Sequence, residues 1–211
     1  MKHKFTTMIM ALAAMGALAT QANAVTFDFQ SNGSNVNLGN TSTFTVGGFS
    51  LTASGFLTAG GTADLYAKFT LGDPTETGLG FVNDPTLPLN QHEIVNTDFI
   101  QLTLPTVPPS NVNEVLVASV QSGEQAKVFF TTTPGTLTGA TLIGTITNAD
   151  GSVTIPAGDQ TGFIDITAGA VNILLASATI STPDSGSAVA LLGIALAGIE
   201  GVRRAFRARR A

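Results

Sequence analysis

Acidic side chains gather in one short stretch of this sequence. Residues 72–98 hold Asp73, Glu76, Asp84, Glu93 and Asp98, which are five of the twelve acids between residues 25 and 181. Carboxylate oxygens carried on loops are the ligands that Ca²⁺ prefers. The stretch therefore suggests a calcium loop with Asp73, Asp84, Glu93 and Asp98 as ligands. Because it has neither EF-hand nor nonapeptide spacing, a solvated acidic loop that needs no cofactor is the simpler interpretation.

Groups for catalysis are scarce. The chain has no Cys, which excludes a thiol nucleophile, a thiolate metal site and a disulfide framework. Between residues 25 and 181 the one histidine is His92, and no Gly-x-Ser-x-Gly turn accompanies it. Glycoside hydrolysis needs two carboxylates that face each other across a cleft, and the pattern singles out no such pair. We expect no catalytic residue and no enzymatic activity, with His92 on a solvated loop.

Residues 182–211 have three parts in a fixed order. The polar motif of residues 182–187 comes first, an apolar run follows over residues 188–199, and a basic tail over residues 203–211 comes last. With its flanks, residues 186–202, the run is near the lower limit for a helix that crosses ~30 Å of hydrocarbon at ~1.5 Å per residue. The tail predicts that this end stays on the cytoplasmic side. It contains five arginines: Arg203, Arg204, Arg207, Arg209 and Arg210.

Residues 1–24 have the organisation of a secretory signal peptide. Lys2 and Lys4 form the charged region, and residues 8–19 are apolar. Ala22 and Ala24 are the small residues of a small-x-small cleavage site. The order predicts export by the Sec machinery and a mature chain that begins at Val25.

The tail resembles a known sorting domain. A polar motif, a short Ala/Leu/Gly-rich helix and an arginine cluster are typical of the PEP-CTERM family, and Thr182-Pro183-Asp184-Ser185-Gly186 is similar to the Val-Pro-Asp-Ser-Gly motif of its VPDSG variant. Thr182 replaces the valine, and both residues are β-branched. The resemblance implies recognition by an exosortase, a membrane-embedded cysteine protease or transpeptidase, with cleavage at or near this motif. It also implies a transient anchor in the inner membrane, followed by release to the cell surface or an extracellular polysaccharide matrix.

The segment between these two ends, residues 25–181, predicts a single all-β domain. Short β-rich runs alternate with turn residues at a spacing of ~8–15 residues, which is typical of an antiparallel sandwich or barrel. We expect the phenylalanines in the core. The predicted strands cover residues 25–30, 42–52, 64–71, 98–104, 114–122, 126–132, 141–147, 162–167 and 171–180.

The charge of this middle segment excludes one class of partner. Its only bases are Lys68 and Lys127, and two bases against twelve acids give a net charge of −10. Such a surface repels phosphate backbones, so we expect no binding to nucleic acid.

A weaker resemblance covers the middle segment. Residues 77–81, 92–94 and 98–102 are similar to a segment of exported PEP-CTERM proteins, which implies a jelly-roll-like or galactose-binding-like sandwich. Fold alone does not give function. Two hypotheses stay open: a structural protein associated with exopolysaccharide, and a carbohydrate-binding module whose acidic loop holds Ca²⁺. A hydrolase is the third, and we do not expect it.

Overall fold

The computed structural model describes residues 23–30, 33–82, 92–103, 111–156 and 162–182, together with Gly193, Ala195, Ala197, Gly198, Ile199 and Arg203. Contacts between residues divide the chain into two units. One is Ala24–Thr182, and the other combines Met1–Asn23 with Pro183–Ala211. In the second unit, the six residues named individually above are helical. Within the described residues no helix has both the length and the apolar character needed to span a membrane.

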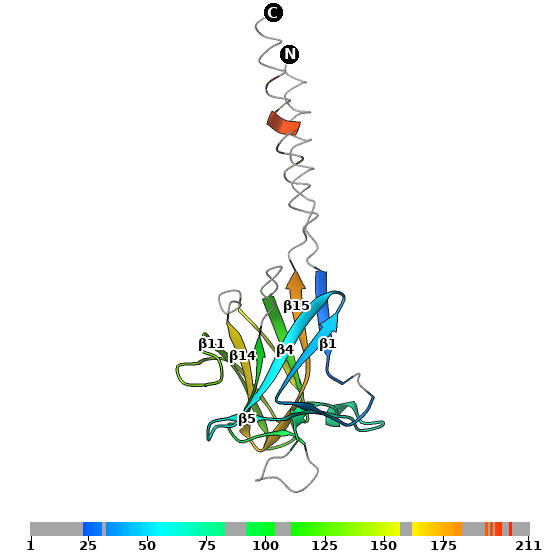
Figure 1. Ribbon diagram of the computed structural model, residues 1–211, viewed down its shortest axis with the longest axis vertical. Helices are drawn as coiled ribbons and strands as arrows, with labels where there is room; N and C mark the ends of the chain where they lie inside the picture. Colours follow the sequence, from blue (N-terminus) through cyan, green and yellow to red (C-terminus); the bar gives the residue numbers. More distant parts are fainter. Residues whose placement is uncertain are drawn as a thin grey trace, which may run out of the picture. The chain divides into compact units, whose positions relative to one another are not determined.

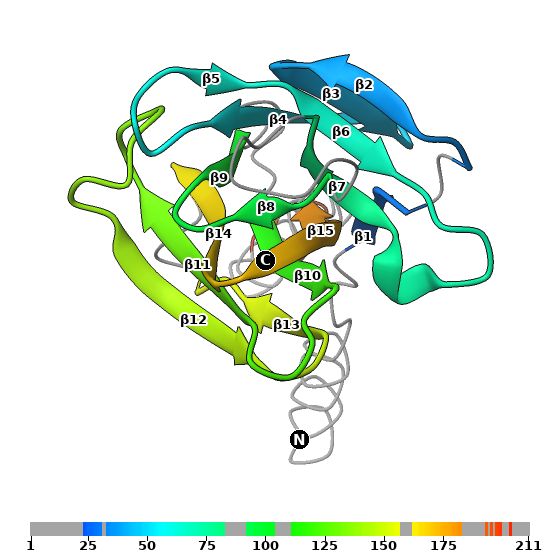
Figure 2. The ribbon, with the colours of Figure 1, turned by 90° about the horizontal axis from the view of Figure 1, so that it is seen from below.

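The unit Ala24–Thr182 consists of two antiparallel sheets that form a sandwich, as the sequence predicts (Figures 1 and 2). Each sheet has a main path of six hydrogen-bonded neighbours, with shorter strands beside it. The first path runs β13 (Gly151–Thr154), β10 (Asn111–Ala118), β15 (Asn172–Thr182), β7 (Gly78–Phe81), β6 (Leu65–Lys68) and β2 (Val36–Gly39). The second runs β12 (Thr141–Thr147), β11 (Gln125–Thr131), β14 (Phe163–Ala170), β9 (Phe99–Thr103), β4 (Phe49–Phe56) and β3 (Thr41–Val46).

Three short strands and one helical turn complete the described fold. In the first sheet β1 (Asn23–Asp28) and β8 (Ile94–Val95) both pair with β15, and in the second β5 (Thr62–Ala63) pairs with β4. The 3₁₀ turn η1 (Pro74–Glu76) precedes β7. Strand β15 is therefore the centre of the first sheet, because it contacts β10, β7, β1 and β8.

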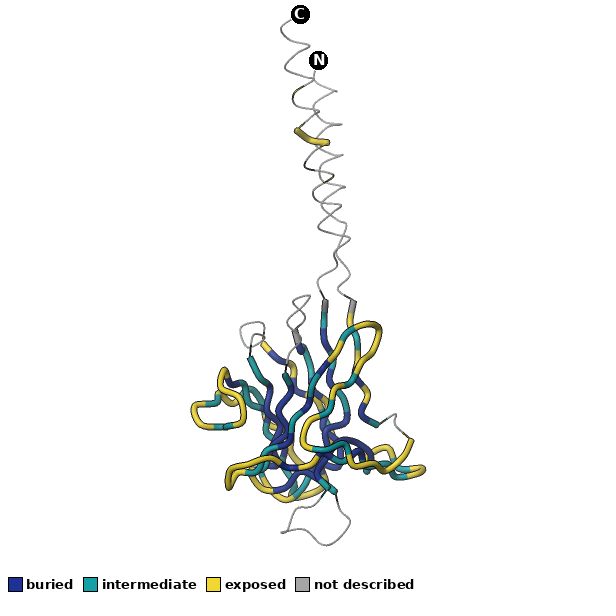
Figure 3. Tube along the Cα trace, viewed as in Figure 1, coloured by how far each residue is buried: buried dark blue, intermediate teal, exposed yellow. Residues whose placement is uncertain are grey.

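The core lies between the two sheets. Strand β4 alternates as a half-buried strand should, with Leu51 and Ala53 inside. Strand β14 is buried continuously from Ile164 to Ala168, which is typical of a central strand covered on both faces. Phe27, Phe29 and Phe81 are the largest fully buried side chains, so these phenylalanines lie in the core as expected. Figure 3 shows buried residues along the strands and exposed residues at the loops.

One predicted strand is wrong, because the structure divides it into two. Residues 42–52 form no single strand, because the chain turns back at Gly47 and Gly48 and makes the hairpin of β3 and β4. Both glycines have positive φ, at 59° and 84°, a conformation that costs glycine little and favours tight hairpin turns.

Candidate functional site: a half-buried lysine between two glutamates

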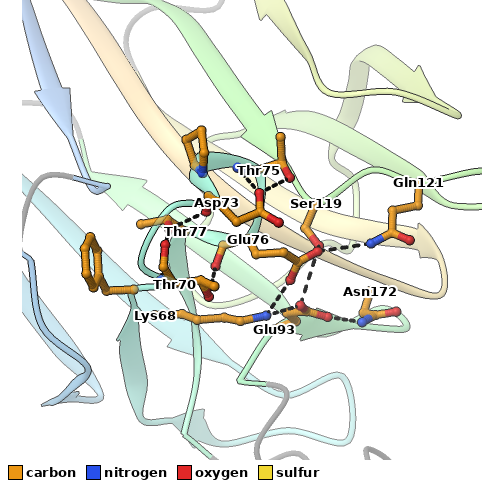
Figure 4. Close-up of polar contacts among 12 residues, drawn as sticks. Lys68, Thr70, Asp73, Thr75, Glu76, Thr77, Glu93, Ser119, Gln121 and Asn172 are labelled. Carbon is orange, nitrogen blue, oxygen red and sulfur yellow. Dashed lines mark hydrogen bonds and ion pairs between the residues drawn. The ribbon is translucent and has the colours of Figure 1, made fainter.

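A polar cluster lies where three strands of the first sheet meet the 3₁₀ turn η1. Lys68 ends β6, Glu76 ends η1, Glu93 directly precedes β8, and Asn172 begins β15. The strand registers bring them together, because Lys68 of β6 pairs with Gly78 of β7, and Asn172 of β15 pairs with Val95 of β8. Figure 4 shows these side chains pointing toward one another.

Two glycines of β7 permit this close approach. A Cβ atom at Gly80 would lie 2.1 Å from the carbonyl oxygen of His92 and 2.8 Å from Cα of Glu93. A Cβ atom at Gly78 would lie 2.8 Å from the carbonyl oxygen of Leu175, and its φ of +157° is one that other residues rarely adopt. The Gly-Leu-Gly sequence of β7 therefore places the backbone that carries Glu93 against the sheet.

Lys68 is the centre of the cluster. Its Nζ donates to Oε2 of Glu76 at 2.8 Å and to Oε1 of Glu93 at 2.5 Å. The side chains of Lys68, Glu76 and Glu93 are 14%, 24% and 4% exposed. The cluster therefore pairs one ammonium with two carboxylates in a partly buried environment, where removal of one partner leaves a poorly solvated charge.

The two carboxylates differ in their remaining partners. Glu76 Oε1 accepts hydrogen bonds from Ser119 Oγ and Gln121 Nε2, both at 3.0 Å. Glu93 Oε2 accepts a hydrogen bond from Nδ2 of Asn172. Lys68 and Asn172 thus bind different oxygens of the Glu93 carboxylate, as Figure 4 shows.

Burial and neighbouring charges shift the pKa values of Lys68, Glu76 and Glu93 in opposite directions. Burial raises the pKa of Glu93 above its ordinary value, and the hydrogen bond and charge of Lys68 only partly offset this. Burial also raises the pKa of Glu76, but Lys68, Ser119 and Gln121 outweigh that effect and hold it below its ordinary value. Burial lowers the pKa of Lys68, and its two carboxylates outweigh burial and raise it. Glu93 is therefore the carboxylate of this cluster that takes up a proton most readily.

The turn that carries Glu76 is fixed by its own side chains. The carboxylate of Asp73 caps η1 by accepting from the backbone N–H of Thr75 at 3.1 Å and from its Oγ1 at 2.6 Å. Thr77 Oγ1 donates to the carbonyl oxygen of Asp73 at 3.0 Å, and Thr70 Oγ1 donates to that of Glu76 at 3.0 Å. Glu76 therefore projects from an ordered turn toward Lys68.

His92 does not lie in solvent as predicted. Its ring stacks on that of Tyr66 with centroids 3.8 Å apart and an interplanar angle of 17°. Its Nδ1 is 2.8 Å from the carbonyl oxygen of Val82. The residue is half-buried, with a positive φ of 53°. His92 therefore fixes the segment that leads into Glu93.

A second polar group is buried in the other sheet. Asp165 of β14 is fully buried, and its Oδ1 accepts from Nε2 of Gln101 on β9 at 2.8 Å. Its Oδ2 is buried without a hydrogen-bond partner among the described residues. Burial raises the pKa of Asp165 to about 7, because the single hydrogen bond from Gln101 offsets it only in part.

A hydrogen bond links the Asp165–Gln101 pair to the loop that borders a surface groove. Oε1 of Gln101 accepts from the backbone N–H of Gly135 at 3.1 Å. The loop of Gly135 forms one wall of a groove of about 450 Å³. Thr58, Thr97 and Thr136 line this groove together with Phe99, and Oγ1 of Thr58 donates to Oγ1 of Thr97 at 2.7 Å.

The proposed calcium ligands have separate partners. Asp84 lies outside the described residues. Asp73 caps η1, Glu93 binds Lys68 and Asn172, and Asp98 Oδ1 accepts from the backbone N–H of Thr58 at 2.7 Å. In the described segments no three acidic or histidine side chains converge as a metal site would require. The four-residue calcium loop therefore stays a prediction.

The predicted export and sorting residues fall mainly outside the described residues. Ala22, the motif residues after Thr182, and Arg204, Arg207, Arg209 and Arg210 all lie there. Thr182 is the last residue of β15, and Ala24 belongs to β1. Arg203 is helical, as are the described positions between residues 193 and 199.

Sequence reasoning missed the cluster itself. The sequence pattern predicts Glu93 as a calcium ligand and counts Glu76 among the acids, whereas it indicates no role for Lys68, Ser119 or Asn172. One feature of the sequence could have indicated a role for Lys68. It is one of only two bases in residues 25–181, and it follows the strand-like Leu65-Tyr66-Ala67.

Comparisons with known proteins identify one segment of the chain. No curated protein matches the sequence. Among solved structures, the crystal structure of the C-terminal CBM6 of LamC, a marine laminarinase from Zobellia galactanivorans, is similar with 12% identity and a TM-score of 0.32. The match covers 76% of this chain and 100% of that one. A likeness this distant identifies neither a ligand nor an activity.

The family comparison is specific and short. Residues 183–206 match the model of the VPDSG-CTERM motif. Such a motif implies an exported, exosortase-sorted protein at the cell surface or outside the cell. Residues 183–206 of this chain are therefore a VPDSG-CTERM motif, a PEP-CTERM-like exosortase sorting signal.

Proposed function

We propose that the sandwich is a non-enzymatic structural protein of the cell surface or extracellular matrix, associated with exopolysaccharide and delivered through a transient anchor in the inner membrane. The observation that carries this proposal is the position of the sorting signal. Strand β15 ends at Thr182, and the matched motif begins at the next residue. Cleavage within the motif would therefore release the sandwich with every described strand intact.

The polar groups of the sandwich support a structural role over a catalytic one. His92 stacks on Tyr66, and the carboxylate of Glu76 is held by Lys68, Ser119 and Gln121. A general base must reach the proton that it abstracts in a substrate pose. The carboxylates of the cluster instead bind groups of the protein itself.

Sorting is tested by following the mature C-terminus in the native host. We expect deletion of residues 182–211, or of the host exosortase, to change the location of the protein and to abolish processing of its C-terminus. The motif variant Asp184→Ala with Ser185→Ala should reduce processing, while Asp159→Ala, an acid outside the motif, should leave it unchanged. C-terminal mass spectrometry gives the readout. Identical C-termini and locations in all strains would refute the proposal.

The groove favours one alternative function, a carbohydrate-binding module with a calcium-stabilised acidic loop. Threonine hydroxyls donate and accept hydrogen bonds as sugar hydroxyls require, and Thr58, Thr97 and Thr136 are among the residues that line the groove. The volume of about 450 Å³ is within the range of small-molecule sites.

Titration calorimetry with polysaccharide fractions tests this alternative. Saturable heat that is lost in Thr136→Val supports it. The matched control is Thr43→Val, because Thr43 lies on β3 and its hydroxyl contacts Thr52 of β4. Titrations with and without Ca²⁺ determine whether metal contributes. Flat traces under both conditions would exclude binding of the tested fractions.

A further inference from the structure

The carboxylate of Glu93 binds both an amine and a carboxamide, those of Lys68 and Asn172. Nζ of Lys68 donates to one oxygen of Glu93 at 2.5 Å, and Nδ2 of Asn172 donates to the other. The amine and the amide therefore lie on either side of the Glu93 carboxylate, which can transfer protons (Figure 4). We propose that Lys68 and Asn172 become joined by a self-catalysed isopeptide bond, with Glu93 as the acid–base group.

The reaction is balanced without any co-reactant. Nζ of Lys68 gives a proton to Glu93 and attacks Cγ of Asn172, which forms the Nζ–Cγ bond. Glu93 passes that proton to Nδ2 as the Cγ–Nδ2 bond breaks, and the second proton that leaves Nζ follows the same route. An ammonium group and a carboxamide thus become a secondary amide and a free ammonium ion. Atoms and charge are conserved, and no oxidant, nucleotide or metal is consumed.

Burial and positioning favour this step. Lys68 and Glu93 are 14% and 4% exposed, so little water competes for the reacting atoms. The registers of β6, β7, β8 and β15 hold the two reactants in place, which removes the entropic cost of bringing them together. Because burial raises the pKa of Glu93, this carboxylate can accept the lysine proton inside the protein.

The electrophile is Asn172 and not one of the glutamates. A carboxylate resists attack by an amine because it is negatively charged, whereas the carboxamide is neutral. Glu76 is held as an anion by Lys68, Ser119 and Gln121, and its pKa lies below the ordinary value. Glu76 therefore anchors the lysine while Glu93 transfers protons.

The bond would join strands that are distant in sequence. Lys68 ends β6 and Asn172 begins β15, so the link joins residues 104 positions apart and crosses over β7, which lies between these two strands. Strand β15 is also the strand that continues into the sorting signal. The link would attach that strand to the sheet covalently. It requires only the folded sandwich, so it does not depend on sorting.

Mass spectrometry of the purified full-length chain tests the proposal. We expect the denatured protein to weigh one ammonia molecule less than its sequence. Digestion with trypsin should then leave the bond after Lys68 uncut and yield a branched peptide in which Lys68 is joined to Asn172. Cleavage after Lys68 together with a linear peptide containing intact Asn172 would overturn the proposal, and this outcome requires no variant to fold.

Two other losses of mass are distinguished by the same digest. A succinimide at Asn32-Gly33 also releases ammonia, but it leaves Lys68 and Asn172 on separate peptides, which contradicts the proposal. An amide between Lys68 and a glutamate would release water instead, and that result would also contradict it.

Single substitutions assign the roles. Lys68→Arg keeps the positive charge but removes the nucleophile, Asn172→Ala removes the electrophile, and Glu93→Gln removes the proton carrier. Each should have the full sequence mass with no branched peptide. Lys127→Arg and Asn148→Ala are the matched controls, and both should keep the branched peptide. Formation of the bond at the wild-type level in Glu93→Gln would refute the role of Glu93.

Discussion

The backbones of Gly80 and His92 lie so close that a Cβ atom on the glycine would be 2.1 Å from the histidine carbonyl oxygen. Gly80→Ala must therefore push the His92–Glu93 backbone away from β7. Overpacking of this kind costs about 1–3 kcal/mol, and we expect the upper end because a backbone atom has to move. Urea unfolding of both proteins measures the difference in the free energy of unfolding.

Gly151→Ala is the matched control for this experiment. A Cβ atom there would meet Cγ2 of the Ile146 side chain at 3.2 Å, and a side chain can adjust where a backbone cannot. We expect a loss of less than about 1 kcal/mol. Equal stability of Gly80→Ala and the wild type would show that the close approach is not maintained in solution. If the isopeptide bond forms, Gly80→Ala should also lower the yield of the branched peptide, because Glu93 moves with His92.

Local patterns were sufficient to predict the class of the fold. The predicted β-rich run at residues 114–122 overlaps β10, and residues 141–147 match the bounds of β12. Five described strands, β2, β5, β7, β8 and β13, were not predicted. Strand β7 shows why, because two of its four residues are glycines whose close contacts lie elsewhere in the chain. Gly78 lies against Leu175, and Gly80 lies against His92 and Glu93.

The polar cluster depends on contacts that no local pattern encodes. Lys68 is 25 positions from Glu93, and Glu93 is 79 positions from Asn172. Their meeting requires the first two residues of β15 to pair with β8 while Leu175 pairs with Leu79 of β7. Such registers are set by the packing of the whole sheet. The sorting motif, in contrast, is linear, and its recognition needed only the order of residues.

The buried carboxyl of Asp165 should make the stability of the sandwich depend on pH. Its pKa is about 7 in the folded chain against an ordinary value of 3.8, so the unfolded chain loses this proton first as pH rises. The free energy of unfolding should therefore fall between about pH 4 and pH 7 and change little above that range. At 1.36 kcal/mol for each pKa unit, the contribution is about 4 kcal/mol at most.

Asp165→Asn isolates this contribution, since Glu93 titrates in the same direction and Glu76 in the opposite one. The amide keeps the shape and the acceptor for Gln101 but carries no charge. We expect the variant to gain stability over the wild type as pH rises from 5 to 8, measured by urea unfolding at each pH. Parallel pH profiles for the two proteins would show that Asp165 has an ordinary pKa.

Lys68→Arg should destabilise the sandwich even though it keeps a positive charge in the cluster. Arginine keeps the charge beside Glu76 and Glu93, so an ion pair is conserved while the isopeptide bond is lost. A link that closes a loop of about 100 residues stabilises by about 4–5 kcal/mol on the loop-entropy argument developed for disulfides. We expect a loss of this size in urea unfolding, with Lys127→Arg within about 0.5 kcal/mol of the wild type. A Lys68→Arg protein as stable as the wild type would mean that the lysine contributes only its charge.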